Sequence, residues 1–191
     1  MEAKLQSILE QQRQVWDKFS PGWKRWDKFL QDFLHPIGAA IIDNLKLEKT
    51  DRVLDVATGT GFPGLIIAKI VTEGEVIGTD LSEQMLDTAR ENAAALGLKN
   101  YEVQVADVED LPFSGEEFDA LSCRMGFMFF PDMQLSADEM HRVLKVGGRA
   151  SASVFGPATK NNWMALTIGV IGRYVEIPPA EPGMPGMFRC S

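Results

Sequence analysis

A glycine-rich turn after a strand-forming segment is the part of this sequence best suited to chemistry. The apolar residues 53–57 lead into a turn that contains Gly59, Gly61 and Gly64, and Pro63 suits the first turn of a following helix. Glycine lets a backbone turn sharply and approach a ligand closely, and the N–H groups of a helix N-terminus attract anions. The pattern predicts a nucleotide-binding loop, and a glycine turn that only packs a helix on a sheet is the alternative.

Two carboxylates follow the next two predicted strands. Asp80 ends the second strand, 19 residues after Gly61, where a carboxylate accepts hydrogen bonds from both hydroxyls of a ribose. A helix-capping role for Asp80 is disfavoured because Ser82 already suits the cap. Asp107 follows the third strand, and two roles are open: accepting the amine of an adenine ring, or being a solvated loop acid. The apolar walls of such a ring would be Leu81, Met85 and Val108.

The elements that must position these residues alternate along the chain from residue 51. Short runs rich in valine and isoleucine alternate with segments whose apolar residues have helical spacing. This pattern predicts an α/β fold of the Rossmann-like, doubly wound type, with a mainly parallel sheet and helices on both faces. Ligands of such sheets bind beyond the carboxyl ends of the strands. The predicted strands are 53–57, 75–79, 102–106, 120–123 and 149–155, and the predicted helices between them are 63–71, 82–96 and 136–144.

The two ends of the chain have a different composition. Residues 2–19 are predicted to form an amphipathic helix that Pro21-Gly22 ends, and a second helical stretch from Trp23 to Leu45 is interrupted at His35-Pro36. One more helix is expected near the C-terminus, before an irregular tail rich in proline and glycine. These C-terminal segments are 161–174 and 177–191. The predicted division is therefore a helical region at 1–46, an α/β core at 47–156 and a helix with a tail at 157–191.

The composition excludes several classes of protein. Of the 191 residues, 45% are hydrophobic and 24% charged, which excludes disordered and collagen-like chains. The net charge of −8 opposes contact with nucleic-acid phosphates, so a small-molecule partner and no nucleic acid are predicted. Two cysteines and two histidines supply neither a disulfide framework nor a zinc site, so no metal is predicted. No apolar run reaches the length of about 18 residues that a membrane span needs, and a cytoplasmic location is expected.

Five motifs resemble, in order and spacing, those of the class I S-adenosylmethionine-dependent methyltransferases, with the ubiquinone and menaquinone biosynthesis branch as the most similar. The resemblance covers about residues 12–190, and five ordered motifs are far more specific than one glycine turn. The motifs are VLDVATGTG at 53–61, VIGTDLSEQML at 76–86, ADVEDLPF at 106–113, FDALSCRMGFMFFPD at 118–132 and MHRVLKVGGR at 140–149.

The resemblance implies how S-adenosylmethionine would be bound. The glycine turn, with Gly59 and Gly61, would run alongside the methionine and ribose parts of the cofactor. Asp80 would bind the ribose hydroxyls, and Asp107 would bind the adenine amine. Asp55 would support the turn and, partly through water, the methionine amino group, and Arg124 with Met125 would lie beside the methionine tail. The predicted cofactor-binding set is Asp55, Ala57, Thr58, Gly59, Gly61, Asp80, Leu81, Met85, Asp107, Val108, Arg124 and Met125.

In the resembled family, the N-terminal region folds over the cofactor as a lid. Trp16, Trp23 and Phe127 are predicted either to wall the substrate site under this lid or to pack in a core. Aromatic faces near a sulfonium stabilise the cation by about 0.5–2 kcal/mol. Core packing is preferred for three further aromatic residues at helical spacing, which are Trp26, Phe29 and Phe33.

The predicted function is direct, in-line transfer of a methyl group from S-adenosylmethionine to a small-molecule acceptor. Two alternatives stay open: a cofactor-binding remnant without catalysis, and a nicotinamide-dependent oxidoreductase. Asp55, Asp107 and the run 111–113 favour the methyltransferase over the oxidoreductase. No catalytic base is predicted, because His141 suits a helix surface and His35 suits capping or packing.

The resembled family continues past its fifth strand with another helix and two further strands, the last of them antiparallel. These C-terminal strands are expected to be missing here, because the sequence ends before them. The predicted strand 149–155 would then be an open edge, covered by the 157–191 tail or by a second copy of the chain. A homodimer is therefore one expected arrangement.

Overall fold

A five-stranded parallel sheet forms the centre of the structure, a computed structural model that describes residues 2–177 and 184–191. The strand order is β3-β2-β1-β4-β5, so the direction of winding reverses between β1 and β4. The predicted doubly wound α/β fold is confirmed, and each predicted strand is present with shifted bounds. The strands are β1 (Arg52–Val56), β2 (Glu75–Asp80), β3 (Tyr101–Val105), β4 (Phe118–Arg124) and β5 (Leu144–Ser153).

The helices cover both faces of this sheet because successive strand residues point to opposite sides. Val53 packs in one apolar layer with residues of α1, α2 and α3, and its neighbour Leu54 packs in the other layer with residues of α4. The predicted cap of α3 is present, since the Ser82 hydroxyl accepts a hydrogen bond from the Met85 N–H at 3.2 Å. The helices are α1 (Glu2–Leu45), α2 (Gly64–Ala68), α3 (Glu83–Ala95), α4 (Met133–Val143) and α5 (Asn162–Ile171), and single 3₁₀ turns lie at η1 (Phe127–Phe129) and η2 (Ala158–Lys160).

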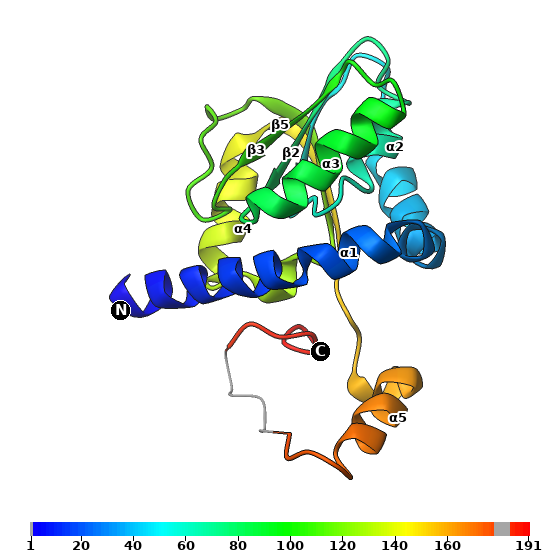
Figure 1. Cartoon of the computed structure of the whole chain (residues 1–191). Coiled ribbons are helices and arrows are strands. Elements are labelled where there is room, and N and C mark those ends of the chain that lie inside the picture. The colour runs from blue at the N-terminus through cyan, green and yellow to red at the C-terminus, as the bar shows by residue number, and fades with distance from the viewer. Residues whose placement is uncertain (1, 178–183) are drawn as a thin grey trace.

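The N-terminal region is one continuous helix, so the predicted breaks at Pro21-Gly22 and His35-Pro36 are wrong. A proline in a helix removes one N–H and leaves the carbonyl four residues earlier without its donor. At Pro21 that carbonyl belongs to Asp17, and the Ser20 hydroxyl lies 2.9 Å from it as a substitute donor. Figure 1 shows α1 crossing the end of the sheet from which β5 leads to α5, then changing direction.

The C-terminal part leaves the sheet after β5. Figure 1 shows α5 separated from the sheet by an extended connection, with the C-terminal segment below α1. The predicted helix 161–174 is present as the shorter α5, and residues 178–183 of the predicted tail lie outside the described residues. The Gly186 N–H donates to the Met128 carbonyl oxygen at 3.1 Å, and Arg189 donates to the Pro131 carbonyl oxygen at 3.0 Å.

β5 forms one edge of the sheet and pairs with β4. Within residues 2–177 and 184–191, the tail adds no strand beside β5; residues 184–191 hydrogen-bond to the segment 128–131, and Phe188 packs on Phe155 just after β5. The expected cover of this edge by the tail is therefore not found as strand pairing, and pairing with a second copy stays a prediction.

Candidate functional site

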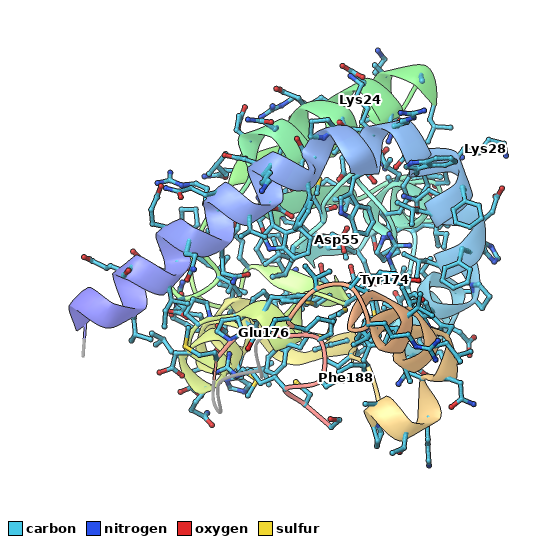
Figure 2. The ribbon with its side chains drawn as sticks, turned by 60° about the horizontal axis from the view of Figure 1, so that its bottom comes forward. Lys24, Lys28, Asp55, Tyr174, Glu176 and Phe188 are labelled. Carbon is cyan, nitrogen blue, oxygen red and sulfur yellow. The ribbon has the colours of Figure 1, made fainter. Side chains whose placement is uncertain are left out.

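A cavity of about 350 Å³ lies at the carboxyl ends of the strands, between the sheet and α1. Its wall includes Asp80 at the end of β2, Arg124 at the end of β4 and the turn after β1. Ligands of parallel α/β sheets bind at this edge, where the strand order reverses. Figure 2 shows α1 arching around this region, with Asp55 inside the arch and both Lys24 and Lys28 on the outer side of the helix.

Asp55 supports the glycine turn from beneath. Its carboxylate is fully buried and accepts hydrogen bonds from the Thr58 hydroxyl at 2.6 Å, the Ser122 hydroxyl at 2.6 Å and the Gly64 N–H at 3.0 Å. Burial raises the pKa of Asp55, and these three donors oppose the shift by stabilising the charged form. Because Asp55 accepts hydrogen bonds from both ends of the turn, it fixes the shape of the loop. Asp55 is not among the residues that line the cavity.

The turn itself needs glycine at two positions. Gly59 has φ +55° and Gly61 has φ +106°, the left-handed region that side chains rarely adopt. A Cβ atom at position 61 would also lie 2.6 Å from the Leu65 Cδ1 atom. Gly61 therefore shapes the turn, whereas Gly59 lines the cavity.

Four of the described residues other than glycine have a left-handed backbone: Lys46 and Glu116, which do not line the cavity, and Ala57 and Met125. Ala57 has φ +53° directly after β1, and Met125 has φ +63° directly after the neighbouring β4. Both line the cavity. Such conformations cost about 1–3 kcal/mol each and tend to cluster at functional sites. The pair at the ends of the neighbouring strands β1 and β4 therefore supports the assignment of a site that already rests on the cavity.

Asp80 is held in place by backbone donors. Its carboxylate accepts the Gly59 N–H at 2.9 Å and the Ser82 N–H at 3.0 Å. Burial raises its pKa to about 6, and the N–H groups of Ser82 and Gly59 oppose this shift. Asp80 thus presents an oriented acceptor to the cavity.

Asp107 lines the same cavity and is fixed by its own turn, since its carboxylate accepts the Glu109 N–H at 2.9 Å. Burial raises the pKa of Asp107. Val108, Leu81 and Met85 lie beside these two acids in the wall. The arrangement suits an adenosine: carboxylates for its hydroxyl and amine donors, and apolar faces for its ring.

Arg124 brings a positive charge to the other side of the cavity. Burial lowers the pKa of its guanidinium, while Asp55 and Asp27 favour the charged form. Its Nη1 atom donates to the Gln31 Oε1 atom on α1 at 3.3 Å. Helix α1 and strand β4 are therefore joined by a hydrogen bond at Arg124.

One stripe of α1 closes the cavity with large apolar side chains, three of them aromatic and three leucine. Trp16 packs edge-to-face on Phe129, with ring centroids 5.2 Å apart, and Phe33 does the same with Trp163 of α5 at 6.4 Å. The residues of α1 that line the cavity are Leu9, Gln12, Trp16, Trp23, Leu30, Phe33 and Leu34. Trp16 and Trp23 are predicted from the sequence. The other residues of this stripe have the same helical spacing, which becomes informative once α1 is one continuous helix.

The structure brings twelve of the fifteen predicted cofactor and lid residues to one cavity. These are Ala57, Thr58, Gly59, Asp80, Leu81, Met85, Asp107, Val108, Arg124, Met125, Trp16 and Trp23. Asp55 and Gly61 support the turn, and Phe127 packs in the core against Phe130 with ring centroids 5.6 Å apart.

Core packing, preferred from the sequence for three aromatic residues of α1, is wrong. Trp26, Phe29 and Phe33 are 57%, 61% and 58% exposed. The wall residues that the sequence did not indicate include Thr60, Phe62, Phe155, Trp163 and Met187. All of these except Thr60 lie outside the five motifs.

A family model described as a methyltransferase domain matches residues 47–166. The chain belongs to this methyltransferase domain family. This assignment agrees with the cavity at the carboxyl ends of the sheet and with the resemblance of the five motifs. S-Adenosylmethionine is the methyl donor that the family assignment implies.

Relatives of this methyltransferase-family chain agree with the assignment. It is 40% identical to a demethylmenaquinone methyltransferase from Thermus thermophilus over 118 residues, which cover 61% of this chain and 53% of that protein. It is 37% identical to an uncharacterized protein of Mycobacterium tuberculosis over 127 residues, 66% of this chain and 45% of that protein. The chain thus spans about half the length of the curated relatives it matches.

A solved structure shares the fold of this methyltransferase-family chain. It is a SAM-dependent methyltransferase from Aquifex aeolicus, with a TM-score of 0.58 and 24% identity, covering 75% of this chain and 81% of that one. Across the described ranges 2–177 and 184–191, no helix has both the length and the apolar character needed to cross a membrane. The same ranges contain no cluster of three or more histidine, cysteine, aspartate or glutamate side chains suited to a metal ion.

Proposed function

We propose that this protein transfers a methyl group from S-adenosylmethionine to an apolar small molecule. The observation that carries the proposal is a single cavity whose wall combines two kinds of side chain. The carboxylates of Asp80 and Asp107 line it together with the rings of Trp16, Trp23 and Phe129. Carboxylates suit the donors of an adenosine, and an aromatic wall suits an apolar acceptor.

The residues that would hold the cofactor are the predicted set. Asp80 accepts hydrogen bonds from the ribose hydroxyls, Asp107 accepts from the adenine amine, and Arg124 with Met125 lies beside the methionine part. S-Adenosylmethionine supplies an activated methyl group on a sulfonium. What remains for the protein is to align the acceptor and exclude water, and such alignment lowers a barrier by about 7–11 kcal/mol in favourable cases. The α1 stripe supplies both, since it covers the cavity with large apolar side chains.

Calorimetric titration tests cofactor binding. Wild-type protein is expected to bind S-adenosylhomocysteine, and Asp80→Ala is expected to weaken this binding by about 10- to 100-fold, because hydrogen bonds to a charged group contribute about 1.5–3 kcal/mol. The matched control is Asp87→Ala on the exposed surface of α3, which should bind as wild type. Binding of a reduced nicotinamide cofactor in place of S-adenosylhomocysteine would favour an oxidoreductase and contradict the proposal.

A methyl-transfer assay tests the acceptor. Demethylated naphthoquinols are the first candidates because a relative is named for demethylmenaquinone, followed by apolar phenols and amines. Transfer to one of them supports the proposal. Binding of S-adenosylhomocysteine without transfer to any acceptor would favour a protein that binds the cofactor without catalysis.

A further inference from the structure

The polar contacts between α1 and the glycine turn are concentrated in one ring of four side chains: Asp27, Gln31, Thr60 and Asn92. The Gln31 amide nitrogen donates to the Asp27 carboxylate and to the Thr60 hydroxyl, both at 3.2 Å. The Asn92 amide nitrogen donates to the same carboxylate at 3.2 Å and to the Thr60 carbonyl oxygen at 2.9 Å. This polar ring joins α1, the turn and α3 next to the cavity, which Thr60 lines.

The ring fixes the orientation of the Gln31 amide. An ionised carboxylate has acceptors and no donor. The Gln31 amide therefore turns its NH₂ group, and not its oxygen, toward Asp27. The amide oxygen of Gln31 then faces the opposite way, toward Arg124, and accepts from its Nη1 atom at 3.3 Å. Gln31 does not line the cavity itself, and its oxygen reaches the cavity only through Arg124.

Arg124 has donors left over. A guanidinium carries five N–H donors in a planar fork that matches a carboxylate. Within residues 2–177 and 184–191, Arg124 forms no ion pair with a carboxylate, and its one side-chain hydrogen bond is the contact with Gln31. A mostly buried cation without a paired anion, in the wall of a cavity, suits an anionic group of a ligand.

We propose that Gln31 is a positioning residue that holds the Arg124 guanidinium so that its free donors receive the carboxylate of the methionine part of S-adenosylmethionine. The inference rests on the proposed function, in that the cavity binds this cofactor. It gives α1 a second role besides covering the cavity. Through Gln31, α1 also orients Arg124, the side chain that would bind the amino-acid part of the cofactor.

Two ligands separate this role from a merely structural one. S-Adenosylhomocysteine carries the carboxylate, and methylthioadenosine keeps the adenosine and lacks it. Gln31→Met is expected to weaken S-adenosylhomocysteine binding about tenfold, the equivalent of about 1.4 kcal/mol, and to leave methylthioadenosine binding within twofold. Arg124→Met should show the same selective loss, at about 10- to 100-fold. Gln31→Glu should also lose S-adenosylhomocysteine selectively, because its carboxylate would occupy the Arg124 donors.

Asn92→Leu is the matched control, because Asn92 belongs to the polar ring and does not contact Arg124. It is expected to change the affinity for both ligands by the same factor. The inference is overturned if Gln31→Met and Gln31→Glu, both shown by circular dichroism to be folded, weaken both ligands equally or neither. Failure of the wild-type protein to bind S-adenosylhomocysteine would overturn the proposed function and this inference together, whereas wild-type binding with unselective Gln31 variants overturns the inference alone.

Discussion

The Ser122 hydroxyl of β4 donates a 2.6 Å hydrogen bond to the carboxylate of Asp55, its register partner on β1. Both side chains are fully buried. This contact joins the two strands at which the winding of the sheet reverses, directly beneath the glycine turn. The loop that faces the cavity therefore depends on a side chain from a different strand.

Removing that hydroxyl should destabilise the fold. Ser122→Ala leaves a buried carboxylate oxygen without its donor, and the expected loss in the free energy of unfolding is about 2 kcal/mol. Urea unfolding followed by circular dichroism measures it. Ser114→Ala, on an exposed side chain, is the control and should change the free energy of unfolding by less than about 0.5 kcal/mol. Equal midpoints for the two variants would contradict the role given to Ser122.

Cofactor affinity should depend on pH through Asp80. Burial raises the pKa of Asp80 from an ordinary 3.8 to about 6. The ionised form is the better acceptor for ribose hydroxyls, so affinity for S-adenosylhomocysteine should rise about tenfold between about pH 5 and about pH 7. Calorimetric titration across this range gives the profile, and in Asp80→Asn the rise should be smaller, leaving only the part that comes from Asp107, whose pKa burial also raises. A wild-type profile without this rise would argue against Asp80 as the titrating acceptor.

The same shift has a consequence of opposite sign for stability. Because the folded state binds the Asp80 proton more tightly than the unfolded chain, the favourable contribution of this group is fully present below about pH 4. It is lost as the pH rises through about 6. Asp80→Asn should therefore reduce the decline in the free energy of unfolding between about pH 4 and about pH 7, as measured by urea titration. An unchanged decline would assign it to other groups.

Two glycine substitutions should have opposite effects. Gly61→Ala places a Cβ atom 2.6 Å from Leu65 in a residue with φ +106°, so a loss of about 2 kcal/mol in the free energy of unfolding is expected. Gly22→Ala lies inside α1, where a Cβ atom meets nothing within 4 Å, so a gain of about 0.5–1 kcal/mol is expected. Thermal unfolding compares the two variants. A stabilising effect of Gly61→Ala would mean that the turn does not need glycine there.

The two tryptophans Trp23 and Trp26 should differ in their effect on turnover. Trp23 lines the cavity, whereas Trp26 does not line it and is 57% exposed. With the acceptor found in the methyl-transfer assay, Trp23→Ala should lower kcat/KM about tenfold, since truncating an aromatic wall removes about 1–2 kcal/mol of contact. Trp26→Ala should leave kcat/KM within twofold. Similar losses in both variants would indicate a general effect on α1.

Much of the fold and of the cofactor half of the site could be predicted from the sequence. Asp80 and Asp107 follow runs of valine and isoleucine whose strand character is a local property, and parallel strands place such residues at one edge. The motif order then indicated which ligand these acids suit. Local signals were sufficient wherever a residue's position depends on its own strand.

The lid could not be predicted in the same way. Pro21 is locally a helix breaker, and α1 continues through it because the Ser20 hydroxyl replaces a missing donor and because the Asp17 carboxylate accepts a 2.6 Å hydrogen bond from the Ser82 hydroxyl at the start of α3. Both conditions depend on side chains that no pattern of apolar spacing reveals. The wrong prediction of core packing for Phe33 has the same origin, because the continuous helix determines which face Phe33 occupies.

The continuity of α1 links the two ends of the cavity thermodynamically. Trp16 and Trp23 line the cavity, Gln31 contacts Arg124 in the cavity wall, and a single helix carries all three. A ligand that orders this helix at one end lowers the entropy cost of ordering it for a ligand at the other end, and such coupling is reciprocal. Donor and acceptor would then bind with positive cooperativity through α1, in addition to the direct contact that methyl transfer requires.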